Sequence, residues 1–68
     1  MYIKLDKISD VREFVGIGIS LDYHVTVKQD GYIVDGKSLM GLFSLDLTKP
    51  VVLDVGNNDN TPFEKFAI

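Results

Sequence analysis

The chain has 68 residues, 46% of them hydrophobic, and its seven basic and ten acidic residues give a formal net charge of −3. This length allows one domain, residues 1–68, and the absence of cysteine excludes disulfides and thiolate metal sites. The basic residues are scattered among acidic ones and no apolar run approaches the roughly 20 residues of a membrane span, so neither a nucleic-acid nor a membrane partner is expected. No signal-peptide pattern follows the first residues, and we therefore expect a cytoplasmic protein.

The chain begins with a predicted strand and a predicted helix. Residues 2–5 alternate apolar and polar side chains, which is typical of a short strand. Ser9 is the expected N-cap of a helix over 10–19, because its hydroxyl can accept from an unpaired amide of the first turn. Gly16 and Gly18 lower helix propensity, and we expect them to let the helix lie close to a sheet. The expected buried stripe has helical spacing: Val11, Phe14, Val15, Gly18 and Ile19.

A hairpin is predicted next. Residues 23–28 alternate again, with the valines on one face and His24 on the other. Asp30 and Gly31 supply the positive φ values of a tight turn, and residues 32–35 form the returning strand. The two strands are therefore expected to pair antiparallel.

The second half of the chain predicts two further helices and one strand. Ser38 is the expected N-cap of a short apolar helix over 39–45, and the apolar run 51–55 predicts a strand. Thr61 is the expected N-cap of a last helix with Pro62 at its first position. The predicted order is β-α-β-β-α-β-α, an α+β fold in which helices cover one face of a four-stranded sheet.

Residues 35–45, Asp-Gly-Lys-Ser-Leu-Met-Gly-Leu-Phe-Ser-Leu, resemble the segment around the regulatory serine of the histidine-containing phosphocarrier (HPr) family of the phosphoenolpyruvate:sugar phosphotransferase system. Six residues match the family's Lys-Ser-Ile-Met-Gly-Val-Met-Ser-Leu run: Lys37, Ser38, Met40, Gly41, Ser44 and Leu45. The resemblance covers roughly residues 20–55, and the two ends agree by element order alone. It implies the family's open-faced two-layer β-sandwich and a place in sugar transport or catabolite regulation.

The family's phosphate acceptor is missing from this chain. The acceptor is a histidine in a Gly-x-His-x-Arg-Pro loop before the first helix, and the family's spacing places Lys7 there, with Ser9 in place of the arginine. Lysine is protonated at neutral pH and is then no nucleophile. His24, the only histidine, is interpreted as a structural residue in mid-strand on the solvated face of the sheet. We therefore expect no catalytic residue and no stand-alone enzyme.

The resemblance implies a regulatory phosphorylation site at Ser38 and a partner-binding patch around it. The patch would consist of neighbours on the short helix: Lys37, Leu39, Met40 and Phe43. Exposed methionine and other apolar side chains are typical of adaptable binding surfaces. The simpler interpretations are that Ser38 only caps the helix and that the apolar residues only line the edge of the core.

The sequence therefore predicts an HPr-like regulatory or protein-binding module without phosphohistidine transfer. Its partners would be an HPr kinase/phosphorylase, a transcriptional regulator or other proteins of the phosphotransferase system. One alternative is phosphotransfer through a substituted acceptor, and another is a purely structural module that forms a homodimer through a sheet edge. No pattern in the sequence predicts a metal site or a cofactor.

Overall fold

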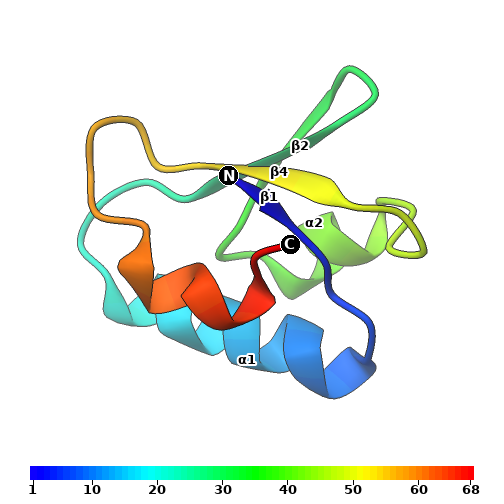
Figure 1. Cartoon of the computed structure of the whole chain (residues 1–68), viewed down its shortest axis with the longest axis horizontal. Helices are drawn as coiled ribbons and strands as arrows, with labels where there is room; N and C mark the ends of the chain where they lie inside the picture. The colour runs from blue at the N-terminus through cyan, green and yellow to red at the C-terminus, as the bar shows by residue number, and fades with distance from the viewer.

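The computed structural model describes all 68 residues and has the predicted order of elements (Figure 1). The elements are β1 (Tyr2–Ile3), α1 (Ile8–Ser20), β2 (Thr26–Gln29), β3 (Tyr32–Asp35), α2 (Leu39–Phe43), β4 (Val51–Asp54) and the 3₁₀ helix η1 (Thr61–Phe66). The sheet order is β1-β4-β2-β3 and every neighbouring pair is antiparallel. The helices lie together on one side of the sheet, which makes a small open-sheet α+β fold (Figure 1). None of the helices combines the length and hydrophobicity needed to cross a membrane.

The core lies between the sheet and the helices. Strands β1, β2 and β4 contribute the buried residues of their helix-facing side, because successive side chains of a strand point to opposite faces, whereas β3 has no buried residue. Phe14 of α1 packs against Phe63 and Phe66 of η1, with ring centroids 4.7 and 5.8 Å away. These contacts confirm that the last helical segment docks on the core, although it is a 3₁₀ helix. The buried side chains form one cluster: Ile3, Leu5, Val11, Phe14, Val15, Val25, Val27, Leu42, Leu45, Val51, Leu53, Val55, Phe63 and Phe66.

The hairpin of β2 and β3 has the predicted turn. Asp30 and Gly31 have φ values of 49° and 85°, which suit a two-residue turn between antiparallel strands. The register pairs Gln29 with Tyr32 and Thr26 with Asp35. The prediction of an antiparallel pair closed by Asp-Gly is confirmed.

The start of α1 differs from the prediction, since Lys7 and not Ser9 holds the N-cap position. The Asp10 carboxylate accepts hydrogen bonds from the backbone N–H groups of Asp6 and Lys7, at 3.1 and 3.0 Å. An acidic side chain at the third helical position thus pairs with the amides at the chain's entry into the helix. The helix can therefore begin at Ile8 without a serine cap.

The buried and exposed faces of α1 also differ in part from the prediction. Ile19 was expected on the buried stripe, but its side chain is 64% exposed. A side chain added at Gly16 would meet no atom within 4 Å, so this glycine is not explained by close packing. Gly18 does permit a close approach, but to Gly36 and Lys37 in the connection between β3 and α2 and not to the sheet.

Several element boundaries move as well. The strand predicted over 23–28 begins at Thr26, so His24 lies in the segment before β2 and not in mid-strand. The predicted cap at Thr61 is wrong, because Asn60 holds the N-cap position and the Thr61 hydroxyl donates to the Asp59 carboxylate at 2.8 Å. Strand β1 ends at Ile3 instead of residue 5. The remaining boundary changes shorten α2 to Leu39–Phe43 and β4 to Val51–Asp54.

Candidate docking surface at α1 and α2

Ser38 is the N-cap of α2, as the sequence predicts. Its Oγ accepts a hydrogen bond from the Gly41 N–H at 3.1 Å, and its carbonyl accepts from the Leu42 N–H at 3.1 Å. The residue is half-buried. The hydroxyl therefore has a structural task whether or not it is ever modified.

The short helix α2 divides its apolar residues between core and solvent. Leu42 is fully buried, whereas Leu39, Met40 and Phe43 are 36%, 85% and 47% exposed. Ile8, in the first turn of α1, is 65% exposed. We name Ile8, Leu39, Met40 and Phe43 the apolar patch. The sequence prediction missed Ile8, which lies between the predicted strand, residues 2–5, and the predicted helix, residues 10–19.

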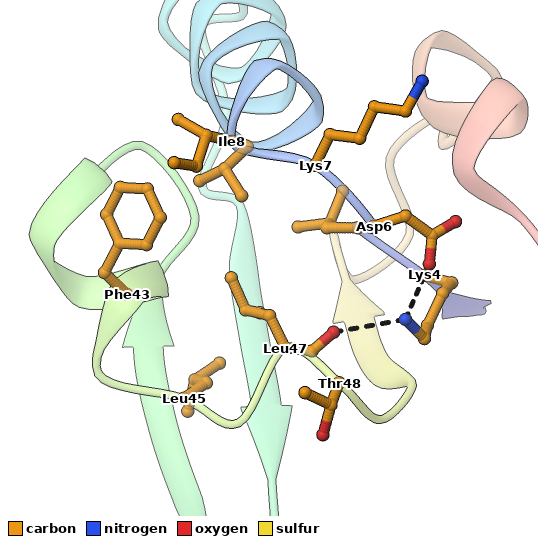
Figure 2. Close-up of a pocket in the computed structure, with 10 residues that line it drawn as sticks. Lys4, Asp6, Lys7, Ile8, Phe43, Leu45, Leu47 and Thr48 are labelled. Atoms are coloured by element: carbon orange, nitrogen blue, oxygen red, sulfur yellow. Dashed lines mark hydrogen bonds and ion pairs between the residues drawn. The ribbon is translucent and has the colours of Figure 1, made fainter.

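A groove of about 460 Å³ is lined by two residues of the patch, Ile8 of α1 and Phe43 of α2, while Leu39 and Met40 lie outside its lining. Figure 2 shows Ile8 and Phe43 at its upper end, with Leu47 and Leu45 below them. The Lys4 ammonium donates to the Asp6 carboxylate at 2.7 Å and to the Leu47 carbonyl at 3.3 Å, which ties the chain before α1 to the loop after α2. The groove is thus apolar at its centre and held at its rim by a lysine.

Positive charge without a carboxylate partner is concentrated beside Ile8. Four of the basic residues form ion pairs with Asp or Glu: Lys4, Lys28, Lys49 and Lys65. Lys7 and Arg12 form none and are exposed. Lys7 precedes Ile8 directly, and Arg12 is four residues after it, on the same face of α1.

Lys37, predicted as a partner-binding residue, is turned towards the end of α1. Its ammonium donates to the Leu21 carbonyl at 2.9 Å, at the C-cap of the helix. Its aliphatic stem passes Gly18. A cation is favourable at a helix C-terminus, so this lysine fastens the end of α1 to the segment that leads into Ser38.

The loop on the far side of the groove is stabilised around Asp46. The Thr48 hydroxyl and backbone N–H donate to its carboxylate at 2.5 and 3.1 Å. These hydrogen bonds, with Lys49 and Lys4 nearby, lower the pKa of Asp46 below its ordinary value against a small opposing effect of burial. The loop therefore keeps its negative charge at neutral pH.

The Asp10 carboxylate lies beside the predicted acceptor position. Lys7 is exposed, and the backbone N–H groups of Asp6 and Lys7 already donate to the Asp10 carboxylate. His24 is also exposed, but it follows the C-terminal end of α1, a helix of 13 residues and so about 20 Å long. The structure therefore does not bring His24 to the start of α1, and no group of three or more His, Asp or Glu is placed to hold a metal ion.

No protein-family model, curated protein or solved structure matches the chain.

Proposed function

We propose that the chain is an HPr-like regulatory or protein-binding module, which docks partners through the apolar patch and transfers no phosphate through histidine. The observation that carries this proposal is the exposure of four apolar side chains on α1 and α2, of which Ile8 and Phe43 line one groove, while Leu39 and Met40 are exposed on the same short helix as Phe43. Clustered apolar side chains on a small protein mark interaction sites. The element order and the run 35–45 support the HPr-like part of the proposal.

The charges around the patch indicate the chemistry of its partners. Lys7 and Arg12 lack carboxylate partners within the chain, while the chain as a whole carries a net charge of −3. A partner surface with an apolar anchor and acidic residues at its rim would complement this corner of the molecule. An HPr kinase/phosphorylase, a transcriptional regulator or another protein of the phosphotransferase system would dock in this way.

Phosphorylation of Ser38 would act as the switch of this surface. A phosphoryl group on Oγ would add a charge of about −1.5 to −2 directly before Leu39 and Met40. The Gly41 N–H, which now donates to Oγ, would still find an acceptor in a phosphate oxygen. Because the Lys37 ammonium already donates to the Leu21 carbonyl, it would not neutralise the added charge. The charge at the patch would weaken the binding of some partners and strengthen the binding of others.

The arrangement at the start of α1 favours a binding module over a phosphocarrier with a substituted acceptor. A phosphoryl group held by helix-start amides needs those N–H groups free and no anion beside them. Here the Asp10 carboxylate occupies the amides of Asp6 and Lys7. A phosphate at Lys7 would therefore lie near the Asp10 carboxylate and be repelled by it.

The modification is tested by intact mass. The chain is incubated with HPr kinase and ATP, and separately with enzyme I and phosphoenolpyruvate, with genuine HPr as the positive control. We expect one added phosphate in the kinase reaction alone, and none in Ser38→Ala. Uptake from enzyme I would instead support the substituted-acceptor alternative, and no uptake in either reaction would contradict the regulatory role of Ser38.

Docking is tested separately by titrating the kinase, without ATP, into wild-type chain and two variants. Met40→Ser removes the most exposed side chain of the patch, and Tyr2→Ser removes a comparably exposed side chain on the sheet face opposite the helices. Met40→Ser should weaken binding about 5- to 30-fold, the loss expected for a buried interface anchor, while Tyr2→Ser leaves it unchanged. Equal binding of both variants would refute the patch as the docking site, and absence of binding would leave the structural module as the better interpretation.

A further inference from the structure

The two edges of the sheet are finished in different ways. Along β1, the C-terminal residues add a further extended segment: Ile3 bridges Ala67, Lys4 N–H donates to the Phe66 carbonyl at 2.9 Å, and Ile68 N–H donates to the Tyr2 carbonyl at 3.2 Å. Strand β3 has β2 on one side and no strand on the other. The edge at β3 is therefore the open one, and the β2–β3 hairpin projects from the body of the molecule (Figure 1).

The backbone groups on this open edge are free. Tyr32 pairs with Gln29 next to the turn and Gly36 N–H donates to the Val25 carbonyl, so residues 32, 34 and 36 direct their backbone groups to β2. By alternation, Ile33 and Asp35 direct theirs outward. The Asp35 carbonyl accepts from Ser38 N–H at 3.0 Å, whereas the N–H and carbonyl of Ile33 and the N–H of Asp35 have no partner in the chain.

The only protection of this edge is the short length of β3 and the charge of Asp35 at its end. Natural edge strands are commonly guarded by lysine, proline or a bulge, and Tyr32–Asp35 contains none of these. Tyr32 and Ile33 are 69% and 68% exposed, on opposite faces of the sheet. A large apolar side chain on each face of an open edge is the pattern of a strand that pairs with another.

The sequence of β3 is complementary to itself in one register. If a two-fold axis passes beside Ile33, the free N–H and carbonyl of Ile33 bond to those of Ile33 in a second copy, because both groups point outward. The two Ile33 side chains then meet on the uncovered face. Tyr32 lies opposite Val34 of the second copy on the helix-covered face, an aromatic pair with a β-branched residue. Asp35 lies opposite Gly31 of the second copy, which has no side chain that could bury the carboxylate.

The neighbouring register is less favourable. Centred on Val34, it pairs Ile33 with Asp35 of the second copy, and its hydrogen bonds need the Asp35 carbonyl that Ser38 already occupies. It also sets each carboxylate beside an isoleucine and diagonal to the other carboxylate, which costs desolvation and repulsion. The register centred on Ile33 forms its central pair of hydrogen bonds without the Asp35 carbonyl, and it sets no carboxylate directly opposite an isoleucine or diagonal to the other carboxylate.

We propose that β3 pairs antiparallel with β3 of a second copy about a two-fold axis at Ile33, which joins the two sheets into one. This inference rests on the sheet edge alone and does not depend on the function proposed for the apolar patch. Because the paired strands have only four residues each, the dimer is weak, with a Kd on the order of 0.1–1 mM. It forms where the protein is concentrated or held locally.

The dimer is tested by sedimentation equilibrium and by amide hydrogen exchange on the full chain, at concentrations from about tenfold below to tenfold above that Kd. We expect a reversible monomer–dimer equilibrium, with protection of the Ile33 and Asp35 amides rising as the dimer fraction rises. Ile33→Pro removes the outward N–H and fills its space, while the ladder to β2 keeps its bonds, and it should weaken the dimer at least about tenfold. Ile33→Thr keeps the N–H and should weaken it less.

Three results would overturn the proposal. They are a monomer at the highest concentration, a dimer in which the Ile33 amide stays unprotected, and a dimer that Ile33→Pro does not weaken. If Ile33→Pro fails to fold, Ile33→Lys replaces it, since it keeps the backbone intact and sets two ammonium groups opposite each other across the axis. An undiminished dimer in that variant counts against the proposal in the same way.

Discussion

At the scale of single residues, two glycines of this small domain have opposite surroundings. Gly36 is buried where β3 turns towards α2, and a Cβ there would lie 2.6 Å from Val25 Cγ1, 3.1 Å from the Val25 carbonyl oxygen and 3.2 Å from a ring carbon of Phe14. Gly16 is exposed in the middle of α1 and a Cβ there would meet nothing within 4 Å. The first glycine is required by packing, and nothing in the structure explains the second.

The pair gives a matched prediction. Gly16→Ala should stabilise the fold by about 0.5–1 kcal/mol, because alanine loses less backbone entropy in a helix. Gly36→Ala should destabilise it by about 2–3 kcal/mol, because the added methyl group forces Val25 or the backbone to move. Urea unfolding of both variants measures the two free energies. A Gly36→Ala variant as stable as wild type would show that the packing around Gly36 is not as tight as the contacts indicate, and a destabilised Gly16→Ala would contradict the entropy argument.

At the scale of elements, the Gln29 side chain of β2 holds the loop that forms one side of the groove. The Gln29 amide group donates to the Asp46 carbonyl at 2.7 Å and accepts from the Asp46 N–H at 2.8 Å. These two hydrogen bonds hold the loop between α2 and β4 beside Gln29, in the way that a neighbouring strand would be held. Leu45 and Leu47, which line the groove, belong to the same loop.

Removing this bridge should loosen the groove without unfolding the domain. Gln29→Ala loses both hydrogen bonds, and we expect a cost of about 1–2 kcal/mol in the free energy of unfolding. Gln29→Glu, the matched variant, keeps an acceptor for Asp46 N–H but sets a carboxylate against the Asp46 carbonyl, so it should be destabilised at pH 7 as well. Amide exchange at Asp46 and Thr48 reports the local effect. Unchanged exchange in both variants would contradict a holding role for Gln29.

The sequence predicted those elements whose signals are local and missed the contacts that are not. The Asp30-Gly31 turn and the Ser38 cap depend on neighbouring residues, and both are present. The cap of α1 was wrong because Asp10, from inside the helix, binds the entering amides before Ser9 is needed. The position of Lys37 against the end of α1 joins residues 16 apart, a contact that periodicity does not reveal.

The candidate site shows the same difference between local signals, which the sequence reveals, and contacts between distant residues, which it does not. Leu39, Met40 and Phe43 were predicted as one patch because they share a short helix and a resemblance, and they are exposed. Ile8 joins them only after the chain folds, since the 18 residues 21–38 separate α1 from α2 in the sequence and the two helices come into contact in the folded chain. Sequence spacing could therefore predict the α2 residues of the patch but not Ile8 of α1.

At the scale of the whole molecule, three aspartates, none of them buried, stabilise turns and connections of the fold. Hydrogen bonds from Thr48 lower the pKa of Asp46, and hydrogen bonds from the Thr61 N–H and hydroxyl lower that of Asp59. The pKa of Asp54, at the end of β4, is lowered first by its bond to the Lys28 ammonium and then by the Gly56 N–H. Each carboxylate anchors a different turn, so their protonation loosens the molecule in several places at once.

These directions predict acid sensitivity. Because each carboxyl has a lower pKa in the folded chain than in the unfolded chain, where it is about 3.9, the unfolded chain binds more protons in acid. The stability that the three carboxylates contribute is therefore present in full above that unfolded pKa and is lost as the pH falls through the folded pKa. We expect the free energy of unfolding, measured by urea titration, to be nearly level between about pH 5 and 7 and to decline from about pH 4 downward.

Asp54→Asn separates this effect from a general one. The variant should be less stable than wild type at pH 7, since it loses the charged bond to Lys28, and its decline in acid should be shallower because one titrating group is gone. Asp22→Asn is the control, since Asp22 is exposed and takes part in no hydrogen bond or ion pair through its side chain. A decline in Asp54→Asn as steep as in wild type, or one equally reduced in Asp22→Asn, would show that net charge and not these anchored turns governs the acid sensitivity of the fold.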